Sequence, residues 1–223
     1  SVDGMKFFCS QLRRQLSRPI ELAMHVHNDF GLGTALAVAA ATAGVNPEVS
    51  VNSISYRAGF AALEEVAVAL EVLYGVSTGI QLEKLTRLSD LVRQRTGLPE
   101  SPLKPLTGAH AFLRDLPSGQ LAYLKGGPLV FPTPGSCLSP TVVGSELRIV
   151  WTHHRSRSVI RAKLEQLRLT ATDAKVDEIC GRIDASLRGK SAYPAWVSEA
   201  DVEMICRTVA AGAPNGSSGV RSA

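Results

Sequence analysis

The sequence predicts an α/β fold, in which helices and parallel strands alternate as they do in barrels and open α/β sheets. In ELAMHVHNDFGLG, residues 21 to 33, a strand that ends in metal-ligand side chains turns directly into a helix. Along the first 79 residues the order is helix, strand, helix, strand, helix, with short connecting loops. This alternation predicts a parallel sheet with right-handed crossovers.

The elements of this first part are predicted from hydrophobic spacing and from the residues at their ends. Met5, Phe8 and Leu12 recur at helical spacing, and glycines end three of the helices. The predicted elements are a helix at 3–17, a strand at 20–27, a helix from about 31 to 44, a strand at 47–55, and helices at 61–75 and 81–97.

The remainder of the chain differs in composition. Eight prolines between residues 98 and 141 predict a largely irregular segment. Helical patterns follow at 157–169, 171–190 and 199–211, the second capped by Thr172 or Asp173 and the third by Ser198. The Gly/Ser-rich tail from 212 to 223 is predicted to be disordered.

Two strands cannot close a barrel, and a complete (β/α)8 barrel takes roughly 250 residues. This chain of 223 residues is therefore expected to contain only the end of a barrel. It begins with Ser1 instead of Met, so we expect further sequence upstream.

Composition excludes several classes of protein. Hydrophobic residues make up 45% of the chain, as expected for a globular core. The net charge is only +4, and its basic cluster at 153–163 has no accompanying aromatic or glycine-rich signature, so no nucleic-acid partner is predicted. The four cysteines form no C-x-x-C pair. With no signal peptide and no apolar run of about 18 residues, we expect reduced cysteines in a cytoplasmic protein without membrane contact.

His25 and His27 are the strongest candidate functional residues. Side chains alternate along a strand, so both imidazoles are expected on one face and Val26 on the other. Two imidazoles on one face suit a metal ion, although an isolated H-x-H pair also occurs as ordinary core or surface histidines. Asn28 and Asp29 break the strand; they could cap the next helix or orient a ligand imidazole, and the sequence favours neither.

These segments resemble the isopropylmalate synthase and homocitrate synthase family, whose members are metal-dependent TIM-barrel enzymes that condense acyl-CoA with 2-oxo acids. LAMHVHNDFGLGTA resembles the H-x-H-N-D-x-G-x-A signature at the end of the seventh strand. VNSISYRAGFAALEEVAVAL resembles the N-G-x-G-E-R-A-G-N-x-x-L-E-E-V segment after the eighth. TGAHAF and GSELRIVWTHHRSRSVIRAKLEQL resemble later segments of the linker subdomain, so the resemblance covers residues 1 to about 209.

The resemblance implies the C-terminal part of a (β/α)8 TIM barrel, about strands 7 and 8, followed by a mostly helical linker and communication subdomain. Residues 1–79 would be the end of the barrel, 80–150 a partly irregular linker, 151–211 a helical subdomain and 212–223 the tail.

The resemblance also implies that His25 and His27 bind a divalent metal, Zn, Mn or Mg, together with an Asp from a first strand that this chain does not contain. The metal would hold a 2-oxo acid, with acetyl-CoA as co-substrate and a 2-hydroxy diacid as product. Pyruvate, 2-oxoisovalerate and 2-oxoglutarate all remain open as the 2-oxo acid. The complete protein is expected to be a homodimer.

Several positions depart from the family pattern. Phe60 stands where the family has Asn near the metal, and Tyr56 replaces the Glu of G-x-G-E-R. Arg57 and Asn52 are retained, Arg57 as a catalytic candidate and Asn52 as a residue that could support the site. Arg114 occupies the position of a catalytic His.

His110, four residues before that position, is the remaining candidate for the catalytic role. His153 or His154 stands near a further family His, although a His-His pair at a helix start is commonly a solvated cap.

Three interpretations follow. In the first, the chain is part of an acyltransferase of the 2-isopropylmalate or homocitrate synthase type, whose activity requires the missing N-terminal barrel. In the second, the departures mark an inactive fragment or a split-subunit binding module. In the third, the chain is part of a hydroxymethylglutaryl-CoA lyase-like enzyme, which also binds its metal through an H-x-H pair. This interpretation fits less well, because the Leu-Glu-Glu-Val helix and the C-terminal helices resemble the synthases.

Overall fold

The computed structural model describes residues 1–188, 190 and 195–212. The chain forms two compact units. The first unit contains residues 1–111 and 140–145, and the second contains residues 112–139 and the described residues from 146 onward. The tail predicted to be disordered lies, except for Gly212, outside the described residues.

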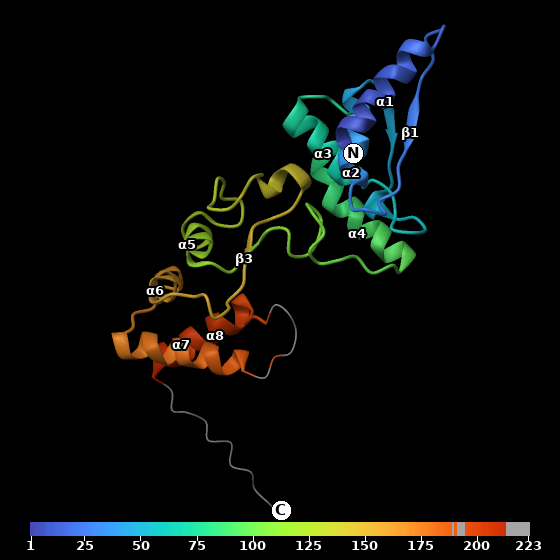
Figure 1. Cartoon of the computed structure of the whole chain (residues 1–223). Coiled ribbons are helices and arrows are strands. Elements are labelled where there is room, and N and C mark those ends of the chain that lie inside the picture. Colours follow the sequence, from blue (N-terminus) through green and yellow to red (C-terminus); the bar gives the residue numbers. More distant parts are fainter. Residues whose placement is uncertain (189, 191–194, 213–223) are drawn as a thin grey trace, which may run out of the picture. The chain divides into compact units, whose positions relative to one another are not determined.

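The helices and strands of the first unit occur in the predicted order, α, β, α, β, α, α (Figure 1). They are α1 (Val2–Gln15), β1 (Ala23–His25), α2 (Gly33–Thr42), β2 (Asn46–Glu48), α3 (Leu63–Tyr74) and α4 (Leu85–Thr96), with 3-10 turns at Val51–Ser53, Leu82–Lys84 and Pro140–Val143.

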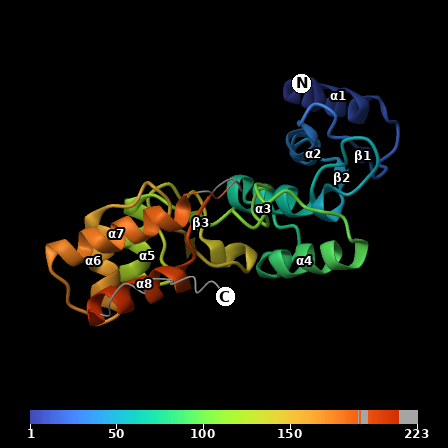
Figure 2. The ribbon, with the colours of Figure 1, turned by 90° about the horizontal axis from the view of Figure 1, so that it is seen from below.

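The two strands of this unit, β1 and β2, pair in parallel, as predicted, and α2 connects them. Figure 2 shows both strands beside α2. The register places Ala23 opposite Asn46 and His25 opposite Glu48. The core of the unit is formed by Val26, which directly follows β1, together with apolar residues of α2 and α3.

Glycines end two helices of this unit as the sequence predicted. Gly75 follows α3 with φ 65°, and Gly97 follows α4 with φ 68°. Positive φ values cost a residue with a Cβ about 1 to 2 kcal/mol, so glycine is the residue that stops a helix in this way.

The strands are shorter than the predicted ranges 20–27 and 47–55, because each has only three residues. A parallel ladder forms only where two strands overlap, and the overlap of β1 and β2 is limited to these residues. The predicted strand residues 51–53 form a 3-10 turn instead, because Asn52 and Ser53 adopt φ values of 58° and 59°. Left-handed backbone of this kind ends a strand.

The second unit is mostly helical (Figure 2). Its helix α5 packs against α6, α6 against α7, and α7 against α8. A second pair of short parallel strands accompanies them. Its elements are β3 (Leu113–Arg114), α5 (Pro117–Gly126), β4 (Arg148–Ile149), α6 (Arg157–Gln166), α7 (Asp173–Leu187) and α8 (Glu199–Ala211).

Helix α5 lies inside the segment 98–141 that was predicted to be largely irregular. Proline was interpreted there as a breaker, but Pro117 occupies the first turn of α5. The first turn of a helix tolerates proline, because its N–H groups have no partner within the helix.

The caps predicted for the last two helices are confirmed. The side chain of Thr172 accepts a hydrogen bond from the backbone N–H of Lys175, and that of Ser198 accepts one from Asp201. The core of this unit surrounds Trp151, which is fully buried and donates from Nε1 to Glu199 Oε2 at 2.7 Å. An indole N–H buried in a core needs such a partner.

Within the described residues, no helix is both long enough and apolar enough to cross a membrane.

Candidate functional site

The candidate site lies at the carboxyl end of β1. His25 is the last residue of the strand, and His27 follows two positions later, where it forms an isolated bridge with Phe60. The ring centroids of His25 and His27 lie 5.2 Å apart. Val26 between them points into the core and is 8% exposed. The prediction that both imidazoles share one face, with Val26 on the other, is confirmed.

Glu48 is the hydrogen-bond partner of His25, with 2.8 Å between His25 Nδ1 and Glu48 Oε2. The two residues are direct partners in the register of β1 and β2. Both side chains are about half exposed, at 47% and 56%. Sequence reasoning missed Glu48, because the register that brings it beside His25 depends on strand pairing and leaves no local signal.

Two aromatic rings complete the surroundings of the imidazoles. The ring of Phe60 lies edge-on to both, with centroid distances of 4.3 Å to His25 and 4.6 Å to His27. Tyr56 lies 5.0 Å from His27. Two of the positions at which this chain departs from the family pattern, Phe60 and Tyr56, are therefore in contact with the predicted metal ligands.

The donor atoms of the two histidines fit a metal ion. Nδ1 of His27 is buried and has no hydrogen-bond partner among the described residues. With Nδ1 of His25 bonded to Glu48, Nε2 is the nitrogen left to bind a metal. Within residues 1–188, 190 and 195–212, however, no group of three or more His, Cys, Asp or Glu could hold a metal. A metal ion bound by these two histidines would need a third ligand from elsewhere.

Asn28 and Asp29 have distinct partners. Asn28 Oδ1 accepts the backbone N–H of Gly33 at 2.8 Å, at the start of α2, and Asn28 N donates to Gly59 O at 2.9 Å. The N-cap residue of α2 is Leu32, which makes no side-chain cap bond, so Asn28 satisfies the first N–H of the helix from outside the cap position. Asp29 instead forms an ion pair with Arg57, whose Nε lies 3.2 Å from Asp29 Oδ1. This pair joins the two loops that carry the candidate site.

Asn52 is held by groups on both sides of its amide. Its Nδ2 donates to Ser89 O at 2.9 Å, and Ser89 Oγ donates to its Oδ1 at 2.6 Å. Its backbone N–H donates to Glu64 Oε1 at 3.1 Å. Glu64 is 1% exposed and forms an ion pair with Lys104. These contacts favour a role for Asn52 in holding the turn at 51–60 that carries Tyr56 and Phe60.

The remaining candidates lie outside this cluster. His110 is half-buried in the loop that follows α4, and its backbone N–H donates to Pro102 O at 2.8 Å. Arg114, in the second unit, donates to Leu113 O and to Ser136 Oγ.

His153 and His154 precede α6, and each contacts an aspartate. His153 Nδ1 lies 3.2 Å from Asp184 Oδ1, and His154 Nδ1 lies 3.1 Å from Asp115 Oδ2. Hydrogen bonding from Arg155, followed by its charge and by His153, lowers the pKa of Asp184. Both imidazoles are about two-thirds exposed, which agrees with solvated residues at a helix start.

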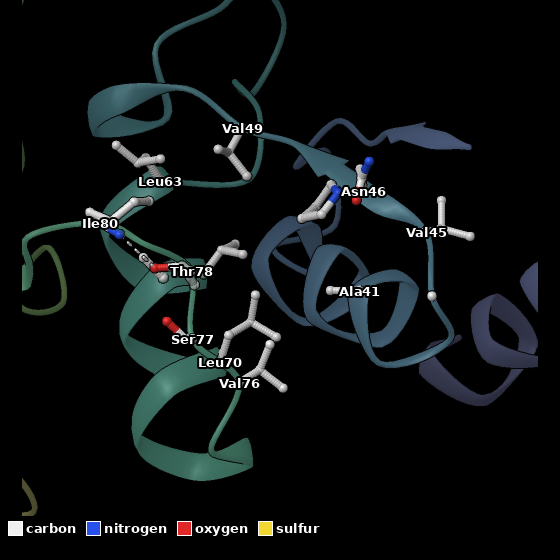
Figure 3. Close-up of a pocket in the computed structure, with 14 residues that line it drawn as sticks. Ala41, Val45, Asn46, Val49, Leu63, Leu70, Val76, Ser77, Thr78 and Ile80 are labelled. Atoms are coloured by element: carbon white, nitrogen blue, oxygen red, sulfur yellow. Dashed lines mark hydrogen bonds between the residues drawn. The ribbon is translucent and has the colours of Figure 1, made fainter. Parts of the chain in front are cut away.

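A pocket of about 450 Å³ lies between α2 and α3, and Figure 3 shows the side chains around it. Most of its lining is aliphatic, including Ala41, Val49, Leu70 and Val76. None of its lining residues is an acid, a histidine, a cysteine or a basic residue. This pocket offers packing surface but no group for acid, base or metal chemistry, so the candidate site is the histidine pair.

Comparison with known proteins gives a consistent result. The HMGL-like family model matches residues 3–92. A putative (R)-citramalate synthase of Methanopyrus kandleri is 40% identical over 209 residues, which are 93% of this chain and 39% of that protein. A homocitrate synthase of the same organism is 35% identical over 183 residues, covering 82% of this chain and 44% of that protein.

A probable 2-isopropylmalate synthase, also from Methanopyrus kandleri, is 35% identical over 165 residues, 74% of this chain and 32% of that protein. The chain therefore spans between 32% and 44% of the length of these three relatives.

Proposed function

We propose that this chain, which belongs to the HMGL-like family of citramalate, 2-isopropylmalate and homocitrate synthases, is the part of such a synthase that supplies two metal ligands. The observation that carries the proposal is the geometry of His25 and His27. Their imidazoles lie 5.2 Å apart on one face at the carboxyl end of β1. In barrels and open α/β sheets, active sites are built at this end of the strands.

The reaction we propose is a Claisen condensation of acetyl-CoA with a 2-oxo acid. A base removes a proton from the acetyl methyl group, the resulting carbanion attacks the ketone carbon, and the ketone oxygen takes up a proton to become the 2-hydroxyl. Water then hydrolyses the thioester to release CoA and a 2-hydroxy diacid. His25 and His27 would hold a divalent metal, Zn, Mn or Mg, which when bound polarises the ketone as a Lewis acid. An Asp from outside this chain would be the third ligand.

The chain's own residues would shape the space around the ligands. The rings of Phe60 and Tyr56 lie against the imidazoles. Asp29 and Arg57 tie the loop after β1 to the loop that carries both rings. Arg57 and His110 remain our catalytic candidates, and the guanidinium of Arg57 is half exposed at 53%.

The proposal includes an arrangement of the whole protein. Residues 1–79 would end a TIM barrel at about strands 7 and 8, 80–150 would form the linker and 151–211 the helical subdomain. The complete enzyme would be a homodimer in the cytoplasm.

A second function is favoured by one specific observation. Phe60 cannot ligate a metal, yet it contacts both imidazoles at the position where the family has Asn. This supports the alternative that the chain is an inactive binding or assembly module of the same family.

A chimaera separates the two. The 209-residue segment of this chain that aligns with the Methanopyrus kandleri citramalate synthase relative would replace the matching segment of that protein, which restores a full-length chain. Release of CoA thiol would be followed with acetyl-CoA and, in turn, pyruvate, 2-oxoisovalerate and 2-oxoglutarate.

Thiol release with one of these acids, lost in a His25→Ala, His27→Ala double variant, supports the synthase. A folded chimaera that releases no thiol supports the binding module. The single variant Phe60→Asn of the chimaera is also assayed. If the parent chimaera releases no thiol and this variant does, the Phe60 ring is the cause of the lost activity.

A further inference from the structure

We propose that Glu48 is the positioning residue of His25, which fixes the proton on Nδ1 and so presents Nε2 to the metal. This inference rests on the proposed function, since it assigns a partner to one of the two proposed ligands. Glu48 acts through the imidazole and need not touch substrate or metal.

The geometry of the pair carries the argument. Glu48 Oε2 lies 2.8 Å from His25 Nδ1, a normal hydrogen-bond distance for a nitrogen donor and a carboxylate acceptor. The residues are register partners on neighbouring strands, so the β1–β2 ladder itself sets their separation. The backbone pairing of the two strands therefore holds the acceptor and the donor close together.

The contact with Glu48 determines which tautomer His25 adopts. A carboxylate accepts only, so the neutral ring beside it carries its proton on Nδ1 and its free electron pair on Nε2. Metals bind the nitrogen that has the free pair. Glu48 thus determines both the tautomer of His25 and the direction in which the ring faces.

The environment of Glu48 indicates that its role is not structural. The side chain is 56% exposed, and within the described residues it forms no other hydrogen bond or ion pair. An exposed pair contributes little to folding. His27 has a different support, since the rings of Tyr56 and Phe60 lie beside it and its Nδ1 has no partner in the described part of the chain.

The test uses two readouts, the first on the full 223-residue chain and the second on the chimaera. The first is the tautomer of His25, read from long-range ¹H–¹⁵N correlations of the imidazole without any metal, with His25→Ala used for assignment. The second is the affinity for cobalt chloride, measured by calorimetry on the chimaera described above, because the chimaera supplies the third ligand. The variants are Glu48→Ala and Glu48→Gln, and Glu21→Gln is the matched control, because Glu21 is exposed, precedes the same strand and carries the same charge.

We expect the wild type to carry the proton of His25 on Nδ1. In Glu48→Ala the proton should shift toward Nε2, and the Kd for cobalt should rise about 10- to 100-fold. Glu48→Gln should keep the tautomer, since its amide oxygen still accepts from Nδ1, and should bind cobalt better than Glu48→Ala. Glu21→Gln should match the wild type, and all four proteins should melt alike.

Two results would overturn the assignment in distinguishable ways. Cobalt binding and a His25 tautomer that are both unchanged in Glu48→Ala would refute the role of Glu48 and leave the proposed function standing. A wild-type chimaera that binds no cobalt would contradict the metal site itself, and with it the role proposed for Glu48.

Discussion

The buried charge beside the candidate site yields a quantitative prediction for Lys104→Met. Lys104 is 9% exposed and forms an ion pair with Glu64, which is 1% exposed. Its Nζ also lies 3.8 Å from Glu65 Oε1 and 3.9 Å from Glu100 Oε1. Methionine keeps the length and much of the packing of the lysine side chain but removes the charge, so three carboxylates would face one another without this cation.

The expected loss is large. Two unit charges about 4 Å apart interact by about 4 kcal/mol at an effective dielectric constant of about 20. Removing one partner of a buried pair typically costs about 3 to 5 kcal/mol, because the other charge stays buried without compensation. A domain is stable by only about 5 to 15 kcal/mol, so Lys104→Met should remove a large part of the stability of the first unit.

Urea unfolding followed by hydrogen exchange and mass spectrometry measures this effect in the first unit. Protection of the Asn52 amide, which donates to Glu64, should fall together with the unfolding midpoint. The matched control is Arg93→Met, which removes an exposed cation paired with Asp90 and should shift the midpoint little, because water screens an exposed ion pair. Equal midpoints for Lys104→Met and Arg93→Met would refute the reasoning.

Three further predictions concern other parts of the chain. Gly59→Ala should unfold at a lower temperature than Gly31→Ala in thermal melts, because both glycines have positive φ but only at Gly59 would the new Cβ collide with backbone. Burial raises the pKa of Cys206 to about 11, so iodoacetamide at pH 8 should label the exposed Cys137 first in peptide mapping, and faster labelling of Cys206 would contradict this. The lowered pKa of Asp184 adds stability above about pH 4 that is lost as the pH falls. When the melting temperature is measured as a function of pH, Asp184→Asn should therefore show a smaller drop below about pH 4 than the wild type.

Helices were predictable wherever local signals were sufficient. The side chains that begin α7 and α8 and the glycines that end α3 and α4 lie within a few residues of the helix they define. Helix α5 was missed because Pro117 has opposite effects in the first turn and in the interior of a helix. Strand lengths depend on the partner strand, which the sequence of one segment does not contain.

The candidate site was predictable to a similar extent. Strand alternation alone placed His25 and His27 on one face, as the structure has them. Glu48 joins them only through the register of the ladder. The contacts of Phe60 with both imidazoles depend on a bridge between His27 and Phe60, which are separated by more than thirty residues of chain. Long-range pairing of this kind has no local sequence signal.

The metal content of the chimaera tests the central claim most directly. After purification and dialysis, elemental analysis should find about one divalent metal ion per chain in the parent chimaera. The His25→Ala, His27→Ala double variant should contain almost none, because two of its protein ligands are lost at once. An unchanged metal content in the double variant would contradict the assignment of these two histidines as ligands.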